Sequence, residues 1–324
     1  MPKHPVMVLS LILPLLVAPF AAAQVPFPSK PIRIIAAFAP GSTLDIMARI
    51  LGPKLNAAMG QPVIVENRPG AGGMIGMDAT AKSAPDGHTL AIGALGPNAT
   101  NPALYVKTPF DPVKDLTGVT LLATGPVVIV THPSVPARTV KELVALAKAK
   151  SGQLNYGTPG VGTSPHLAGE LFQSVTGTKI VHVPYKGNPE ALNDLIGGQL
   201  SLVFSGMPPV IPFVKAGRIR AIATTGGQRA ATLPETPTLA EAGYPGAGMV
   251  IWYGVVAPGA TPREVISKLH AEINKAMKLP DVRERFVALG ADPAMSSPEE
   301  FSALIRDEYA RWSKLIRAAN IKAE

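Results

Sequence analysis

The sequence predicts an α/β protein made of two lobes, and three observations support this class. Short aliphatic runs alternate with stretches of helical periodicity, the pattern of βαβ units and a largely parallel sheet. The chain has 324 residues, enough for two domains of ordinary size. Two longer apolar runs, at 119–131 and 249–257, bracket an internal block with the same alternation. We expect the chain to leave the first lobe near residue 125 and to return near 255, with a cleft between the lobes.

The amino-terminal segment predicts export. Lys3 is followed by an apolar run over residues 6–18 and by three alanines at 21–23, just before Gln24. A positive start, an apolar core and an A-x-A site are the parts of a secretory signal peptide. The run contains Pro14 and is shorter than the roughly 20 apolar residues of a spanning helix. We therefore expect cleavage after Ala23, with a retained membrane anchor as the alternative.

The first lobe begins with two units of strand, turn and helix. A helix follows Ser42, because apolar residues from Leu44 to Met59 recur at three- and four-residue steps. Asp45 and Arg49 lie off that apolar face. The expected order is strand 31–38, helix 43–59, strand 63–66, glycine-rich turn 67–73, helix 74–82 and strand 89–93.

The internal block repeats this order, and three helices close the chain. In the block we expect helix 140–150, strand 154–156, helix 164–175, strand 180–183, helix 188–196 and strands 200–204 and 219–224. The closing helices, 262–277, 282–289 and 298–319, should pack back on the first lobe. Residues 24–125 with 256–324 then form lobe 1, and 126–255 form lobe 2, after a signal peptide over 1–23.

Composition excludes several classes of protein and site. The chain has no cysteine, which removes disulfides, thiolate metal sites, cysteine nucleophiles and a lipid-modified amino-terminal cysteine. Its net charge of +8 comes from Lys and Arg scattered among acidic residues, so no nucleic-acid partner is expected. The six histidines lack the spacing of metal ligands, and no metal site is expected.

Two glycine-containing loops each end a strand and open a helix. Residues 38–45 lead from the first strand into the first helix. The N-terminus of that helix offers unpaired N–H groups and partial positive charge to an anion. Simple capping is the competing interpretation, with Ser42 or Thr43 as N-cap and Asp45 as its capping-box partner. Residues 156–166 repeat the pattern, and Pro165 favours Ser164 as the N-cap of the next helix.

A third loop, residues 67–76, is similar to a dinucleotide-binding fingerprint. The G-x-G-x-x-G pattern requires glycine at position 75, where Ile75 stands. A tight turn with close packing of helix on sheet explains the glycines instead. No cofactor is therefore expected. A hydrolase using Ser164 and His166 is also disfavoured, because the G-x-S-x-G pattern of a nucleophile elbow is absent.

Taken together, the motifs resemble those of the Bug receptors, the TctC-like periplasmic substrate-binding proteins of tripartite tricarboxylate transporters. The resemblance runs through nearly the whole mature chain. It rests on residues 38–41, Asp45 with 48–49, and residues 65–73, 166–172, 183–187 and 240–243.

The resemblance implies a two-lobe periplasmic-binding-protein fold of type II, the Venus flytrap, with two crossover strands. It also implies a non-enzymatic periplasmic receptor, expected to be a monomer. Such a receptor captures a small organic acid, a di- or tricarboxylate or an aromatic carboxylate, and delivers it to a membrane permease. The alternatives are a sensor or scavenger acting without a permease and, less favoured, the Ser164/His166 hydrolase.

In such receptors the carboxylate is held between two opposing loops, here 38–45 and 158–166, with the ring of Phe38 packing on the ligand. Two positions depart from the family pattern: Ser42 replaces a frequent glycine, and Ser205 a frequent acidic residue. Ser205 would favour an acidic or uncharged distal group on the ligand over a cationic one. The candidate ligand-binding residues are Phe38, Gly41, Ser42, Thr43, Asp45, Thr158, Gly162, Thr163, Ser164, His166, Tyr185 and Ser205.

Overall fold

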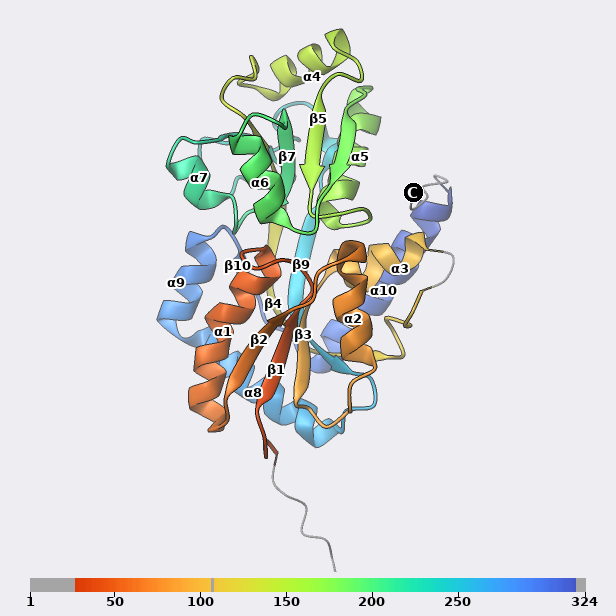
Figure 1. Ribbon diagram of the computed structural model, residues 1–324, viewed down its shortest axis with the longest axis vertical. Helices are drawn as coiled ribbons and strands as arrows, with labels where there is room; N and C mark the ends of the chain where they lie inside the picture. The colour runs from red at the N-terminus through yellow and green to blue at the C-terminus, as the bar shows by residue number, and fades with distance from the viewer. Residues whose placement is uncertain (1–26, 106–107, 319–324) are drawn as a thin grey trace, which may run out of the picture.

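The strands pair in two groups that share one long strand, β4 (Leu116–Thr131) (Figure 1). The computed structural model describes residues 27–105 and 108–318. The path of hydrogen-bonded strands is β2-β1-β3-β9-β4-β7-β5-β6, and β8 and β10 also pair with β4. The signal peptide expected over residues 1–23 lies outside the described residues. In the part that is described, no helix combines the length and the apolar character needed to cross a membrane.

The first group of strands forms the core of lobe 1. β1 runs parallel to β2 and β3, and β9 runs antiparallel to both β3 and β4. Its strands besides β4 are β1 (Ile32–Ala36), β2 (Val63–Asn67), β3 (Thr89–Ala94), β9 (Val250–Pro258) and β10 (Asp292–Pro293). Its helices are α1 (Thr43–Met59), α2 (Met74–Ala81), α8 (Arg263–Lys278), α9 (Pro280–Ala288) and α10 (Pro298–Ala318).

The second group forms lobe 2 around the far half of β4. β5 runs parallel to β6 and β7, whereas β7 and β8 run antiparallel to β4. The strands are β5 (Asn155–Thr158), β6 (Val181–Pro184), β7 (Leu202–Gly206) and β8 (Arg220–Thr224). The helices are α4 (Val140–Ala149), α5 (Ser164–Thr176), α6 (Asn188–Ile196) and α7 (Ile211–Lys215).

The two-lobe α/β class is confirmed, and β4 and β9 are the two strands at the crossing. β4 pairs with β9 as far as Pro126 opposite Val250, and with β7 from Val127 opposite Gly206. The carboxyl-terminal helices return to lobe 1: α8 packs against α1 and β4, and α10 against β4. The ends of β1, β5 and β6 therefore meet between the lobes, where the loops that open α1, α5 and α6 lie (Figure 1).

Several short elements were not predicted. They are the π-helical turn η2 (Gly96–Thr100), α3 (Asn101–Leu104), α7, β10 and the 3-10 turns η1 (Ala71–Gly73) and η3 (Pro245–Ala247). The segment after β3 contains Pro97, Asn98 and Pro102, residues that are typical of loops, so the sequence shows no helical periodicity there.

Two local predictions were wrong by one residue. The N-cap of α5 is Thr163, and Ser164 is already its first helical residue. Ser42 is the N-cap of α1, but its side chain makes no capping bond, and Asp45 accepts from the Gly41 amide rather than from that of Ser42. The glycine turn was interpreted correctly: a Cβ on Gly76 would lie 2.8 Å from Ala37, so α2 packs directly on the end of β1.

Candidate ligand-binding cleft

A small cavity of about 40 Å³ lies between the two lobes. Both loops predicted to hold a ligand reach it, together with η2, α6, β7 and β9. None of its lining side chains is charged. The lining residues are Phe38, Thr43, Leu44, Ala94, Gly96, Pro97, Pro159, Thr163, Ser164, Pro165, Asn188, Gly206, Ile251 and Tyr253.

Three helices begin at this cavity. Thr43, Ser164 and Asn188 are the first residues of α1, α5 and α6, and all three line it. The first turn of each helix has N–H groups without intrahelical partners and carries partial positive charge. Their convergence makes the cavity suited to an anion without any cationic side chain.

The loop before α1 is held by a buried carboxylate. Asp45 is only 3% exposed, although the helical pattern left it off the apolar face. It accepts hydrogen bonds from the Gly41 amide at 2.8 Å, from Arg49 Nε at 3.0 Å and from Asn67 Nδ2 at 2.9 Å. Burial acts to raise the pKa of Asp45, but the bonds from Arg49, Gly41 and Asn67 outweigh it and lower the pKa. The carboxylate stays ionised and fixes the loop from behind.

At the cavity surface of this loop, Thr43 meets Tyr253 of β9. Burial raises the pKa of Tyr253, the neighbouring Thr43 hydroxyl acts in the opposite direction, and the net rise keeps the phenol neutral. A neutral phenol and a hydroxyl can each donate to an acid or accept from one. The neighbouring Ser42 Oγ is buried and has no hydrogen-bond partner among the described residues.

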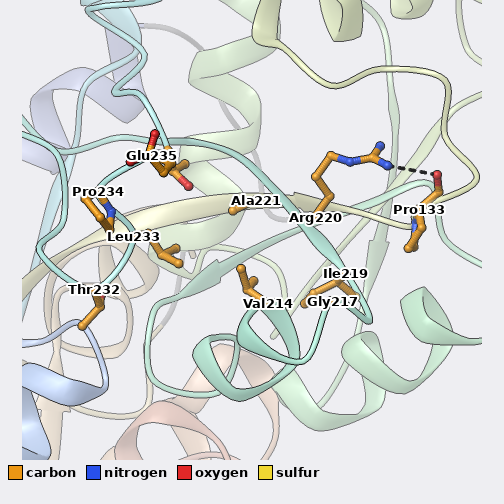
Figure 2. A pocket seen from close by; sticks show the side chains of 11 residues that line it. Pro133, Val214, Gly217, Ile219, Arg220, Ala221, Thr232, Leu233, Pro234 and Glu235 are labelled. Atoms are coloured by element: carbon orange, nitrogen blue, oxygen red, sulfur yellow. Dashed lines mark hydrogen bonds between the residues drawn. The ribbon is translucent and has the colours of Figure 1, made fainter.

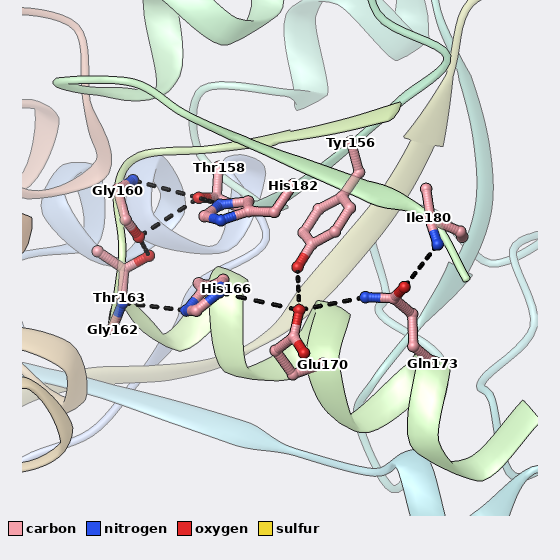
Figure 3. Close-up of polar contacts among 10 residues, drawn as sticks. All are labelled: Tyr156, Thr158, Gly160, Gly162, Thr163, His166, Glu170, Gln173, Ile180 and His182. Atoms are coloured by element: carbon pink, nitrogen blue, oxygen red, sulfur yellow. Dashed lines mark hydrogen bonds and ion pairs between the residues drawn. The ribbon is translucent and has the colours of Figure 1, made fainter. Parts of the chain in front are cut away.

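The loop before α5 is braced by hydroxyls and imidazoles (Figure 3). Thr163 Oγ1 donates to Gly160 O at 2.7 Å, and the Gly160 amide donates to Thr158 Oγ1 at 3.2 Å. The Gly162 amide donates to His166 Nδ1 at 3.0 Å. The His166 ring must carry no proton at Nδ1 to accept this bond.

Behind this loop, the rings of His166 and His182 stack with their centroids 4.2 Å apart. Both rings are drawn in Figure 3. His182 Nε2 and Thr158 Oγ1 lie 2.7 Å apart in a hydrogen bond, and His166 Nε2 lies 3.9 Å from Glu170. Burial, and then the electrostatic interaction with the neighbouring His166, lowers the pKa of His182 to about 3. At neutral pH His182 is therefore an uncharged support of the loop.

Tyr185 and Ser205 do not line the cavity. Tyr185 donates from its hydroxyl to Asp194 at 2.6 Å. Ser205 is fully buried; its Oγ accepts from Asn188 Nδ2 at 2.7 Å and donates to Gly206 O at 2.9 Å. Ser205 therefore orients Asn188, which lines the cavity.

The predicted residues thus fall into two sets around the cavity. Phe38, Thr43, Thr163 and Ser164 line it. The other eight are not among the lining residues: Gly41, Ser42, Asp45, Thr158, Gly162, His166, Tyr185 and Ser205. Direct contact of each with a ligand stays a prediction.

Sequence reasoning missed Asn188, Ile251 and Tyr253 as lining residues. Asn188 was within reach of that reasoning, because residues 184–189 repeat the order of strand, glycine and helix start seen in the other two loops. Ile251 and Tyr253 fall in the apolar run 249–257, and sequence reasoning did not place either of them in the cleft. Their place beside Thr43 depends on the pairing of β9 in the sheet, which no local pattern indicates.

A larger hollow of about 400 Å³ lies elsewhere on lobe 2, between β8, α7 and residues 232–236 (Figure 2). It is lined mainly by apolar residues, and Arg220 is one of its charged residues. The Arg220 guanidinium donates to the carbonyls of Val135, Ala137 and Pro133 at 3.2–3.4 Å. Its donors are thus largely used within the protein, so this hollow is a poorer anion site than the cleft.

Comparison with known families settles the class of the protein. A family model described as "Tripartite tricarboxylate transporter family receptor" matches residues 47–321. The chain belongs to this family. It is a periplasmic solute-binding receptor of the Bug and TctC type, as the sequence motifs indicated.

Three relatives illustrate the range of similarity. Protein BugT of Bordetella pertussis is 38% identical over 297 residues, which cover 91% of each chain. The structure of Rpa4515 from R. palustris with adipate is 33% identical, with a TM-score of 0.88, over 91% of this chain and 99% of that one. MatC of Rhodopseudomonas palustris with bound malate is 30% identical, with a TM-score of 0.84, over 90% and 100%.

Proposed function

We propose that this receptor binds a small organic carboxylate in the interlobe cleft and delivers it to a tripartite tricarboxylate transporter permease. The convergence of three helix N-termini on one cavity is the observation that carries the proposal. It supplies N–H donors and positive potential to a carboxylate, with no buried cation to be desolvated. We further propose that the protein acts in the periplasm as a monomer, after cleavage behind Ala23.

The cavity lining supports an acid whose distal group is acidic or uncharged. Hydroxyl and amide groups come from Thr43, Ser164, Asn188 and Tyr253, and the ring of Phe38 supplies an apolar wall. No carboxylate lines the cavity among the described residues, so an ammonium group on a ligand would find no anionic partner there. The dicarboxylates adipate and malate are bound by two relatives, which is consistent with this class.

Binding and closure are linked in the proposed mechanism. A carboxylate that bridges the loops before α1 and α5 contacts both lobes only when they are together, so its binding free energy favours the closed form. The crossing of β4 and β9 is the proposed hinge, between lobe 1 (24–125 with 256–324) and lobe 2 (126–255). The permease can then recognise the closed receptor.

A thermal-shift and calorimetric screen of the mature protein tests the ligand class. We expect adipate, malate or a related acid to raise the melting temperature saturably, because a ligand specific to the folded state stabilises it by RT ln(1 + [L]/Kd). Ser164→Ala should weaken binding several-fold, and an amino acid of similar length should bind more weakly than the dicarboxylate. A preference for the amino acid would contradict the proposed class.

The two alternative functions have separate tests. In a hydrolase, Ser164 and His166 would act together; instead His166 Nδ1 accepts from Gly162, and its Nε2 lies beside Glu170. Turnover of an ester or amide panel that disappears in Ser164→Ala would nonetheless establish it. Capture of membrane permease subunits by the closed, acid-bound receptor separates transport from a sensor or scavenger role.

A further inference from the structure

A second set of contacts joins the lobes beside the cavity. Thr100, at the end of η2 in lobe 1, donates from Oγ1 to Gly162 O of lobe 2 at 2.7 Å. Thr100 is fully buried, and so is Asn101, the next residue. The turn is π-helical, a form that is rare in proteins and frequent at functional sites. Gly96 and Pro97 of the same turn line the cavity, whereas Thr100 and Asn101 do not.

Two glycines make room for Asn101 at this junction. Asn101 Nδ2 donates to Gly72 O at 2.6 Å. A Cβ on Gly72 would overlap Asn101 Nδ2, and a Cβ on Gly162 would overlap Asn101 Oδ1. The glycine turn at 70–73 therefore serves more than the packing of α2 on β1, because it also admits the side chain that abuts lobe 2.

The backbone of Gly162 is thus hydrogen-bonded to both lobes, through its N–H and through its carbonyl. Its N–H donates to His166 within lobe 2, and its carbonyl accepts from Thr100 of lobe 1. Thr163 and Ser164, the N-cap and first residue of α5, follow directly and line the cavity. A hydroxyl of lobe 1 therefore bonds the part of lobe 2 that leads directly into two lining residues of the cavity.

We propose that Thr100 and Asn101 are positioning residues that orient the ligand loop 158–163 only while the lobes are closed, and so set affinity without touching the ligand. This inference rests on the proposed function of the cleft. Separation of the lobes breaks the bond from Thr100 to Gly162 O, which leaves this carbonyl to water and leaves the Thr100 hydroxyl with its longer contact to Gly96 O at 3.2 Å. The bond therefore adds to the closed population, and apparent affinity scales with that population.

The test compares Thr100→Val, which removes the hydroxyl and keeps the shape, with Thr100→Ser, which keeps the hydroxyl. Calorimetry with adipate and with malate gives Kd, and stopped-flow fluorescence gives dissociation rates. We expect Thr100→Val to weaken both acids about tenfold through faster dissociation, the effect of one buried hydrogen bond. The ratio of the two affinities should not change, since Thr100 does not line the cavity. Thr100→Ser should resemble the parent protein.

A second readout needs no ligand. The Thr100 contact lies between groups of the chain itself, so amide hydrogen exchange at residues 160–164 should become faster in Thr100→Val but not in Thr100→Ser. Unchanged exchange together with unchanged Kd would overturn the inference and leave the receptor proposal standing. If the parent protein binds neither acid, the proposed ligand class fails, and hydrogen exchange alone tests the inference. Faster exchange in Thr100→Val then supports the inference, and unchanged exchange overturns it. If Thr100→Val does not fold, Asn101→Ala, which loses the bond to Gly72, is expected to give the same pattern.

Discussion

The loops before α1 and α5 have the same sequence pattern but are held by different chemistry. Each leaves a strand, turns at a glycine with positive φ and opens a helix at the cavity: Gly41 has a φ of 80° and Gly162 one of 72°. Behind the first loop lies an ionised carboxylate, Asp45, bonded to Arg49. Behind the second lie two imidazoles: His166, which accepts from the Gly162 amide, and His182, which is neutral at neutral pH.

This difference shows that a helix N-terminus alone does not define an anion site. The N–H groups must be held in place, and each lobe has its own means of doing so. An ion pair keeps its partners charged down to acidic pH. A neutral imidazole nitrogen that accepts a hydrogen bond loses that bond when it is protonated. The two halves of one ligand site should therefore respond differently to mutation and to pH.

The largest expected effect separates the two glycines. Gly162→Ala adds backbone strain and a Cβ that overlaps Asn101, whereas the Cβ of Gly41→Ala would meet only Pro189 Cγ, at 3.3 Å. We expect Gly162→Ala to weaken acid binding by about a hundredfold or more and Gly41→Ala by about tenfold, measured by calorimetry. Gly177→Ala is the control for strain alone, since Gly177 has a φ of 62° and open space around it. Equal losses at Gly41 and Gly162 would contradict the proposed lobe contact.

A smaller effect is expected from Asp45→Asn. The amide of the variant can accept fewer of the bonds from Gly41, Arg49 and Asn67. The Arg49 guanidinium also loses its negatively charged partner. We expect a loss of about 2 kcal/mol in the free energy of unfolding, measured by urea denaturation. Asp281→Asn is the matched control, because its ion pair with Lys54 is exposed and contributes little to stability. A loss at Asp45 no larger than at Asp281 would refute the role given to this carboxylate.

The last effect, the smallest when counted per pH unit, is a pH dependence specific to lobe 2. In the folded protein His182 has a pKa of about 3 and stays neutral above that pH. In the unfolded chain the same side chain takes up a proton below about pH 6.5. The folded state therefore binds fewer protons, and stability falls as the pH drops from about 6.5 toward 3, by about 1 kcal/mol per pH unit after allowance for partial exposure.

Denaturation at a series of pH values, with the parent and His182→Gln, measures this slope. The variant should flatten the curve between pH 6 and about 4, where Asp45 remains ionised in both states. Asp45 has a lowered pKa, so its contribution is present above about pH 4 and is lost only below it. Parallel curves for parent and variant would show that His182 does not support the loop in its neutral form.

Most of the fold could be predicted because the strands and long helices have strong local patterns. Aliphatic runs marked the strands, and the spacing from Leu44 to Met59 marked α1 to its last residue. The turn η2 could not be found this way, since its prolines and polar residues resemble a loop. The division into lobes at 125 and 255 stays a prediction about domain boundaries.

The site was predictable only where it followed local sequence. The loops around Thr43 and Ser164 were found because glycine, hydroxyl residues and a helix start stand together in the chain. Tyr253 reaches Thr43 through the pairing of β9 with β3 and β4, and Thr100 reaches Gly162 across 62 positions. Such contacts depend on tertiary structure. The burial of Asp45 was missed for the same reason, because Asn67, from the next strand, helps to enclose it.

The uninterrupted course of β4 governs how the molecule can deform. Its pairing passes from β9 at Pro126 to β7 at Val127 without a single unpaired residue between them. No slack tether therefore separates the halves along this strand, and a change in their angle must be absorbed as torsion of a hydrogen-bonded ribbon. This torsion falls at Pro126 and Val127, where the partner of β4 changes from β9 to β7.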